Sequence, residues 1–245
     1  MVMGNAQEPE GTQEQGGAAR GRPPGRTTQG DQTKDRLYTT ALRLMAAQGY
    51  GSTTLRQIAA EAGVSHALLY RYFPSKGAVV LALYERLSAD FVATVALAKG
   101  PWRQRAFLAT QGSLAALADH RSTLVGAIPV LVSGAEGGLF SEQTRFSLER
   151  VRGVFMDAVG AATDAPKPAR SKALASLLYL VHLGILLTWL LDRSPGQRAT
   201  AALVKLFKTG LPLVAAALLL PGAWRLVLRA DAIFEEALLG PAVDG

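Results

Sequence analysis

Cysteine is absent from this sequence, and histidine occurs only three times, at His66, His120 and His182. The lack of cysteine excludes disulfides, thiolate metal sites and cysteine nucleophiles, and it is consistent with a reducing compartment. The histidines are far apart and do not form a cluster with acidic residues at the spacing of metal ligands. A glycine-rich phosphate loop is also missing. We therefore expect no enzyme, no catalytic residue, no metal site and no cofactor.

Residues 1–36 lack an apolar segment long enough for a secretory signal, which predicts a cytoplasmic protein. Residues 173–191 carry no formal charge, and a helix of that length is long enough to span a bilayer. Ser176, His182 and Thr188 interrupt the run, and a helix that is apolar all round is also typical of a buried or dimer-forming helix. We expect a buried helix and no stable membrane insertion, with a membrane span as the alternative.

Positive charge is concentrated in one part of the chain, whose formal net charge is +7. Residues 20–86 contain ten lysines and arginines against four acidic residues, a balance of +6. Residues 87–245 contain sixteen basic and twelve acidic residues, only +4 over more than twice the length. The excess lies where a polyanion such as DNA would use it.

Residues 53–76 read as two short helices joined by a glycine turn, the outline of a helix-turn-helix. Gly63 can adopt the positive φ required after the first helix, and Ser65 is a good N-cap for the second. Outward residues of the second helix are small or polar at its start, and aromatic hydroxyls and a cation follow. This order suits a helix that enters a major groove between two rows of phosphates.

The pattern around this segment joins a glycine–aromatic pair, two threonines, an Ile-Ala pair, Ala-Gly-Val-Ser and Leu-Tyr-x-Tyr-Phe with a following lysine. It is carried by Gly49, Tyr50, Thr53, Thr54, Ile58, Ala59, Ala62, Gly63, Val64, Ser65, Leu69, Tyr70, Tyr72, Phe73 and Lys76. Over residues 34–87 the chain thereby resembles the N-terminal domain of the TetR family of transcriptional regulators. It departs from the family pattern at His66, Ala67 and Leu68, where many relatives have a basic residue, glycine and a small polar residue.

The resemblance implies an all-α fold, and no run with strand alternation argues against it. We expect a disordered basic arm over residues 1–30 and a DNA-binding domain of three helices over residues 31–80. A linking helix would extend to about residue 98, and a helical ligand-binding and dimerisation domain would occupy residues 81–240. The first helix is expected to begin at Lys34.

The resemblance also implies which residues meet DNA. Hydroxyl and ammonium groups suit phosphate oxygens, while a guanidinium can fork onto a guanine edge. Phosphate contacts are expected from Thr53, Thr54, Tyr70, Tyr72 and Lys76, and contacts at or beside the bases from Arg56, His66, Ala67, Leu68 and Arg71, with Ser65 at the helix start. Leu68 touches a thymine methyl or belongs to the core, and His66 is a neutral groove contact or a pH switch.

Upstream, the segment around Arg20, Arg22 and Arg26 resembles the Arg-Gly-Arg-Pro core of AT-hook peptides. Flexible arginine arms follow narrow A·T-rich minor grooves because the negative potential is enhanced there. A solvated basic linker is the alternative.

Two apolar helices, over about residues 169–191 and 197–220, are more hydrophobic than a monomer surface tolerates, which predicts a homodimer formed through them. Middle helices with Pro129 and a glycine loop at residues 134–138 would enclose an apolar pocket for a small lipophilic effector. Its candidate lining residues, for which ordinary core packing is the alternative, are Trp102, His120, Phe146, Phe155, Tyr179, His182 and Trp189.

The combined expectation is a ligand-responsive DNA-binding regulator, a repressor that binds an inverted-repeat operator as a dimer and is released by the effector. The alternative is a constitutive or architectural DNA-binding dimer without an effector, associated with the membrane through residues 173–191.

Overall fold

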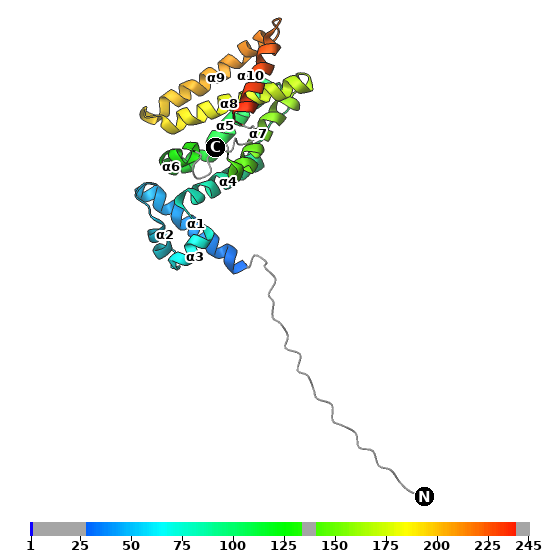
Figure 1. Cartoon of the computed structure of the whole chain (residues 1–245). Coiled ribbons are helices and arrows are strands. Elements are labelled where there is room, and N and C mark those ends of the chain that lie inside the picture. Colours follow the sequence, from blue (N-terminus) through cyan, green and yellow to red (C-terminus); the bar gives the residue numbers. More distant parts are fainter. Residues whose placement is uncertain (2–27, 134–140, 239–245) are drawn as a thin grey trace.

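The computed structural model describes Met1, residues 28–133 and residues 141–238, and no strand occurs in these ranges. The expected all-α fold is confirmed (Figure 1). The α-helices are α1 (Thr28–Gln48), α2 (Leu55–Glu61), α3 (His66–Tyr72), α4 (Lys76–Thr94), α5 (Trp102–Leu117), α6 (Arg121–Ser133), α7 (Arg145–Gly160), α8 (Pro168–Leu191), α9 (Arg198–Ala217) and α10 (Ala223–Leu238). Helices α1–α3 form one end of the molecule, and α4 leads from them into the bundle of the remaining helices.

Helix α1 begins at Thr28, six residues before the expected start at Lys34. This also corrects the expected arm, because residues 28–30 are helical rather than disordered. Asp31 lies in the first turn, where a negative charge is favourable beside the helix N-terminus. The apolar stripe starts only at Leu37, and hydrophobic periodicity therefore gave no signal for the first turns.

Local capping explains the short helices of the helix-turn-helix. Thr54 Oγ1 accepts a hydrogen bond from the backbone N–H of Gln57 at 3.2 Å, and Gln57 Oε1 accepts from the N–H of Thr54 at 2.8 Å. This reciprocal pair is a capping box for α2. Gly63 has φ of +63°, and Ser65 Oγ accepts from the N–H of Leu68 at 3.2 Å to cap α3. The predicted turn and N-cap are confirmed.

Two hydrophobic cores share α4. The first joins α1–α3 to the N-terminal half of α4, to α6 and to the C-terminal end of α8, with Leu37, Leu69 and Leu83 among its buried members. The second lies among α4, α5, α7, α8, α9 and α10, and Phe91 of α4 is buried in it. The domain boundary at residue 80 stays a prediction, because it falls within a helix that belongs to both cores.

Helices of the C-terminal part differ from the expected outlines only in detail. Pro129 and Pro212 lie inside α6 and α9, so neither proline ends its helix. Helix α4 ends at Thr94, before the expected limit near residue 98. The glycine loop at residues 134–138 lies outside the described residues.

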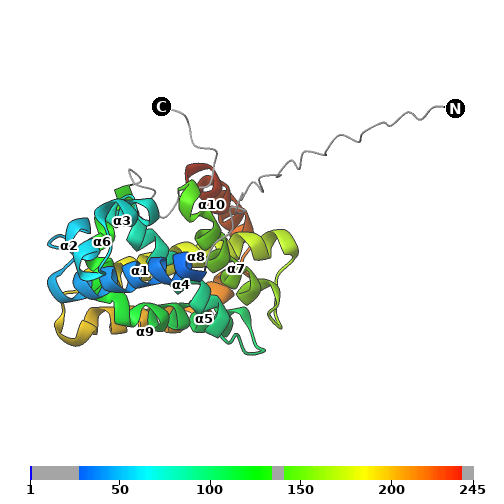
Figure 2. The same cartoon turned by 90° about the horizontal axis from the view of Figure 1, so that it is seen from below.

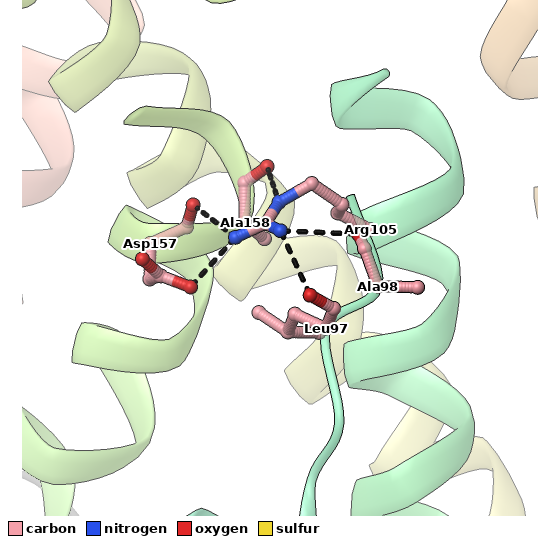
Figure 3. A network of polar contacts seen from close by, with 5 residues as sticks. All are labelled: Leu97, Ala98, Arg105, Asp157 and Ala158. Atoms are coloured by element: carbon pink, nitrogen blue, oxygen red, sulfur yellow. Dashed lines mark hydrogen bonds and ion pairs between the residues drawn. The ribbon is translucent and has the colours of Figure 1, made fainter. Parts of the chain in front are cut away.

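A buried arginine fixes the segment that follows α4 (Figure 3). The guanidinium of Arg105, on α5, donates to the carbonyl oxygens of Leu97 at 2.9 Å and Ala98 at 3.1 Å. It also donates to the carbonyls of Asp157 at 2.9 Å and Ala158 at 3.1 Å, near the C-terminal end of α7, and to the Asp157 carboxylate at 2.7 Å. Arg105 is 5% exposed, and it joins three separate chain segments.

Helices α8 and α9 are both long and apolar enough to cross a membrane. Their most apolar windows have mean hydropathies of 2.1 for residues 168–191 and 1.3 for residues 195–217. Helix α8 packs against α7 and α10 and buries one side of its surface, including Leu174, Leu178 and Ile185. Such packing is typical of the core helix of a globular domain, which favours the expected buried helix for residues 173–191.

Candidate nucleic-acid interface

Helix α3 presents a mixed polar and aromatic surface at the end of the molecule. His66, Ala67, Tyr70 and Arg71 are exposed, while Leu69 is fully buried beneath them. The rings of His66 and Tyr70, one helical turn apart, meet edge to face with centroids 4.6 Å apart. Seen from below, α1–α3 lie in front of the other helices (Figure 2). A rigid helix with free side chains on its outer face is what major-groove reading requires.

The residues beside this helix divide into accessible and enclosed groups. Arg56 and Thr54 are exposed, whereas Tyr72 is partly buried against the first core. Thr53 is fully buried, and its Oγ1 donates to the carbonyl of Gly49 at 2.9 Å. This corrects the expectation of a phosphate contact from Thr53, because its hydroxyl serves the turn after α1 instead.

Leu68 and Lys76 hold intermediate positions. Leu68 is half-buried but belongs to neither hydrophobic core, so its side chain remains available for an apolar base contact. The ammonium of Lys76 donates to the backbone carbonyls of Tyr50 at 2.8 Å and Gly51 at 3.3 Å and lies 4.5 Å from the centre of the Tyr50 ring. Lys76 therefore ties the start of α4 to the turn between α1 and α2, and its phosphate contact stays a prediction.

Lys76→Met is expected to lower the free energy of unfolding by about 1 kcal/mol, because two charge-assisted bonds and a cation–π contact are lost at a half-buried site. Urea denaturation followed by circular dichroism measures this change. Lys99→Met, at an exposed position in the segment after α4, is the matched control and should change stability by less than about 0.5 kcal/mol. Equal stability of the two variants would contradict the structural role of Lys76.

The arginines of the predicted minor-groove arm, Arg20, Arg22 and Arg26, lie outside the described residues. Their role stays a prediction.

A cavity of about 40 Å³ lies where α4, α5, α7 and α8 meet. Drug-sized ligands occupy roughly 300–1,000 Å³, so in this conformation the cavity has room only for a group the size of one or two waters. Its wall includes Tyr84 and Phe91 of α4, Ser113 of α5, and Tyr179 and His182 of α8. Burial raises the pKa of Tyr84 and of Tyr179 and lowers the pKa of His182 to about 4.

The structure brings only part of the predicted pocket together. Phe155 lies with its ring centroid 5.9 Å from Tyr179 and 5.0 Å from His182, and these three rings form one cluster. Tyr84, Phe91 and Ser113 also line the cavity but were missed, since their positions on α4 and α5 read as ordinary helix faces.

Four other predicted pocket residues lie elsewhere. Phe146 was expected to face inward and is 66% exposed, with the Arg150 guanidinium 4.4 Å from its ring, so that expectation is wrong. Trp189 is buried in the first core, with the guanidinium of Arg121 5.7 Å from its ring. Trp102 borders a separate surface groove, and His120 lies partly exposed in the short 3-10 turn after α5.

Residues 37–83, which contain α2, α3 and most of α1, match the family of bacterial regulatory proteins described as the tetR family. The match identifies a tetR-type regulatory domain within this chain. The match ends within α4, so it covers the DNA-binding helices and leaves the larger helical part outside.

Two curated relatives each match part of this chain. An uncharacterized HTH-type transcriptional regulator, YerO of Bacillus subtilis, is 38% identical over 55 residues, 22% of this chain and 19% of that protein. The HTH-type transcriptional repressor DrrR1 of Streptomyces coeruleorubidus is 32% identical over 83 residues, 34% of this chain and 31% of that protein. The chain therefore spans less than a third of the length of these relatives.

Solved structures extend the likeness of fold to most of the chain. A tetR-family regulator from Streptomyces coelicolor has a TM-score of 0.54 and 23% identity, over 83% of this chain and 89% of that one. The regulator FadR from Bacillus subtilis, in complex with stearoyl-CoA, has a TM-score of 0.52 and 15% identity, over 72% and 98%. These relatives and structures are named as transcriptional regulators and not as enzymes, which agrees with the expectation from the sequence.

Proposed function

We propose that this protein is a DNA-binding transcriptional repressor that binds an inverted-repeat operator as a homodimer and leaves it when a small lipophilic effector binds. The observation that carries the proposal is the exposed outer face of α3, held by the capped and buried helix-turn-helix beneath it. The match of residues 37–83 to the tetR family and the repressor DrrR1 among the relatives support it. In this proposal Tyr70, Thr54 and Lys76 contact phosphates, and Arg71, His66 and Arg56 read or flank bases.

An unpartnered apolar face on α8 and α9 supports the homodimer. Leu206, Leu213 and Leu220 recur every seven residues along or just after α9 and are each more than 60% exposed. On α8, Val181 and Leu187 are exposed on either side of Gly184. Seven-residue repeats of this kind suit helix pairing. In a two-fold dimer, α8 and α9 of both protomers would form a four-helix bundle.

Dimerisation would give the DNA contact its geometry. Two copies of α3 would lie about one turn of DNA apart, roughly 34–36 Å, or a simple multiple of it, so the operator would be an inverted repeat. Each half-site contact is small, and joining two of them raises the overall affinity through effective concentration.

The release step is proposed to pass through α4. Tyr84, Leu87, Ser88 and Phe91 of this helix form part of the cavity wall, and in this proposal a ligand larger than the cavity displaces them. The N-terminus of α4 is bound to the DNA-binding domain through Lys76. Displacement of α4 would therefore change the spacing of the two α3 helices and favour the state that does not fit the operator. The FadR structure holds stearoyl-CoA, and a lipophilic effector here is compatible with that likeness of fold.

The proposal is tested by mapping bound genomic sites, followed by gel shift with purified protein and by cell fractionation. An inverted-repeat site that is released by a lipophilic compound supports it. Protein that sediments with membranes, or operator binding that no lipophilic compound weakens, favours instead the constitutive or architectural dimer.

Variants of the neighbouring residues Tyr70 and Arg71 should distinguish a loss of overall DNA affinity from a loss of base preference. Arg71→Ala is expected to relax base preference at one position of each half-site by about 1–3 kcal/mol, because a bidentate base contact is lost. Tyr70→Phe should weaken all sequences equally, by a few-fold, through loss of one phosphate hydrogen bond. Fluorescence anisotropy on the mapped operator and its single-base variants measures both effects.

Arg145→Ala, on the exposed surface of α7, is the control for these DNA measurements and should leave binding unchanged. A uniform loss for Arg71→Ala, or a base-specific loss for Tyr70→Phe, would reverse the assignment of the two residues.

A further inference from the structure

The wall of the inner cavity includes a residue that has a hydrogen-bonding atom without a partner. His182 is 1% exposed, and its Nε2 lies 3.3 Å from Ser113 Oγ. Its Nδ1 has no hydrogen-bond partner. In the described ranges, three buried side-chain atoms lack a partner: Arg152 Nε, His182 Nδ1 and Asp231 Oδ1. Of these three residues, His182 is the one that lines the cavity. Buried polar atoms are normally paired, so Nδ1 marks a place for a hydrogen-bonding group.

The cavity wall is otherwise apolar, aromatic or hydroxylic. It carries no aspartate, glutamate, lysine or arginine, being formed by Tyr84, Leu87, Ser88, Phe91, Ser113, Leu117, Val151, Tyr179, His182, Leu183 and Leu186. Ser88 Oγ already donates to the carbonyl of Glu85 and accepts from Arg150, both at 2.8 Å. Burial holds the pKa of His182 at about 4, so its imidazole is neutral near pH 7.

We infer that this cavity binds an uncharged, aromatic or similarly lipophilic compound with one hydroxyl group, and that the hydroxyl hydrogen-bonds to His182 Nδ1. The inference rests on the proposed effector function and names the chemical class that the effector would have. Nδ1 is a donor or an acceptor according to which imidazole nitrogen carries the proton, and a hydroxyl matches either case.

Other classes fit this wall less well. A carboxylate would be buried in a wall that itself carries no cation, which disfavours its charged form. The nearby guanidinium of Arg150 already bonds to Ser88. That of Arg152 bonds to Ser176 and Glu235. A hydrocarbon would offer Nδ1 no hydrogen-bonding group. The cavity of about 40 Å³ has room for the hydroxyl end of such a compound. The apolar part of the compound would occupy the space that opens when α4 is displaced in the proposed release step.

Three probes of equal ring size test the inference on the full-length protein: benzyl alcohol, toluene and benzoate. The chain has only three histidines, so a ¹H–¹⁵N correlation spectrum of the imidazoles reports directly on each. Benzyl alcohol is expected to shift the Nδ1 resonance of His182 and to leave those of His66 and His120 in place. Its Kd should be about tenfold lower than that of toluene and more than about a hundredfold lower than that of benzoate.

His182→Phe keeps an aromatic ring and removes both ring nitrogens, and it also assigns the His182 signals. In this variant the Kd values of benzyl alcohol and toluene are expected to become equal, whereas His120→Phe should keep the tenfold difference. If His182→Phe does not fold, His66→Phe and His120→Phe assign the His182 signals by elimination, and the shift and the three Kd values of the unmodified protein decide the matter. Absence of a His182 shift with benzyl alcohol near its solubility limit, or a Kd for benzoate as low as that of the alcohol, overturns the inference.

Gel shifts on the mapped operator separate this inference from the proposed function. Selective binding of benzyl alcohol without release of DNA would leave the ligand class intact and contradict the proposed release. Release of DNA by lipophilic anions but not by neutral alcohols would support an effector and contradict the ligand class.

Discussion

Arg105→Leu is expected to lower the free energy of unfolding by roughly 2–4 kcal/mol, because four backbone carbonyls lose the donor that satisfies them. Those carbonyls belong to Leu97, Ala98, Asp157 and Ala158. The Asp157 carboxylate is 57% exposed, so water screens its attraction to the guanidinium and the loss comes mainly from the carbonyls. For a chain of this length the midpoint of thermal unfolding should fall by about 4–16 °C.

Urea denaturation and calorimetry measure the effect of Arg105→Leu. The matched control is Arg145→Leu, which removes an exposed ion pair to Glu149 at 3.0 Å within one helix and should cost less than about 0.5 kcal/mol. Similar losses for the two variants would show that the network in Figure 3 does not hold the α4–α5 segment.

Gly184→Leu is expected to break the proposed homodimer while leaving the protomer folded. A Cβ atom placed on Gly184 meets no atom within 4 Å in the protomer, and leucine is a better helix former than glycine. Across a two-fold interface the added side chain occurs twice, and overpacking costs about 1–3 kcal/mol for each copy. The Kd of dimerisation should rise on the order of 30-fold to 10⁴-fold, and operator affinity should fall with it.

Light scattering after size-exclusion chromatography measures the oligomeric state, and anisotropy measures operator binding. Gly153→Leu is the control, since Gly153 is also an exposed helical glycine with no atom within 4 Å of an added Cβ, but it lies on α7. A stable dimer of Gly184→Leu would place the interface elsewhere on the protein.

The helix-turn-helix could be predicted because its turn and its helix caps depend on residues that are close in sequence. Gly63 and Ser65 act through neighbours within a few residues, and the turn and the cap were confirmed at those positions. The predicted phosphate contact of Thr53 was wrong because a position in the family pattern does not show which way a side chain points. Its hydroxyl donates to the carbonyl of Gly49 instead of facing outward.

Tertiary packing decided what could not be predicted. Phe146 and Phe155 are nine residues apart on α7 and therefore lie on opposite faces of this helix. Which of the two faces is buried depends on where α8 and α4 pack against α7, and it is the face of Phe155. The cavity likewise depends on residues from four helices that are distant in sequence. The spacing of residues along one helix does not show where it will contact three others, so the cavity could not be predicted from the sequence.

Helix α4 contributes buried residues to both hydrophobic cores, so the two parts of the protein are expected to unfold together. A cut after residue 75 would separate the DNA-binding helices from Val80, Leu83 and Leu87, which belong to their own core, and from Leu124 of α6 and Trp189 of α8. The DNA-binding helices α1–α3 are therefore recognisable as a unit in the sequence, but we expect them not to fold without α4, α6 and α8. Local opening of α4 would expose both cores together, and amide exchange in α2 and in α7 should therefore follow one cooperative event.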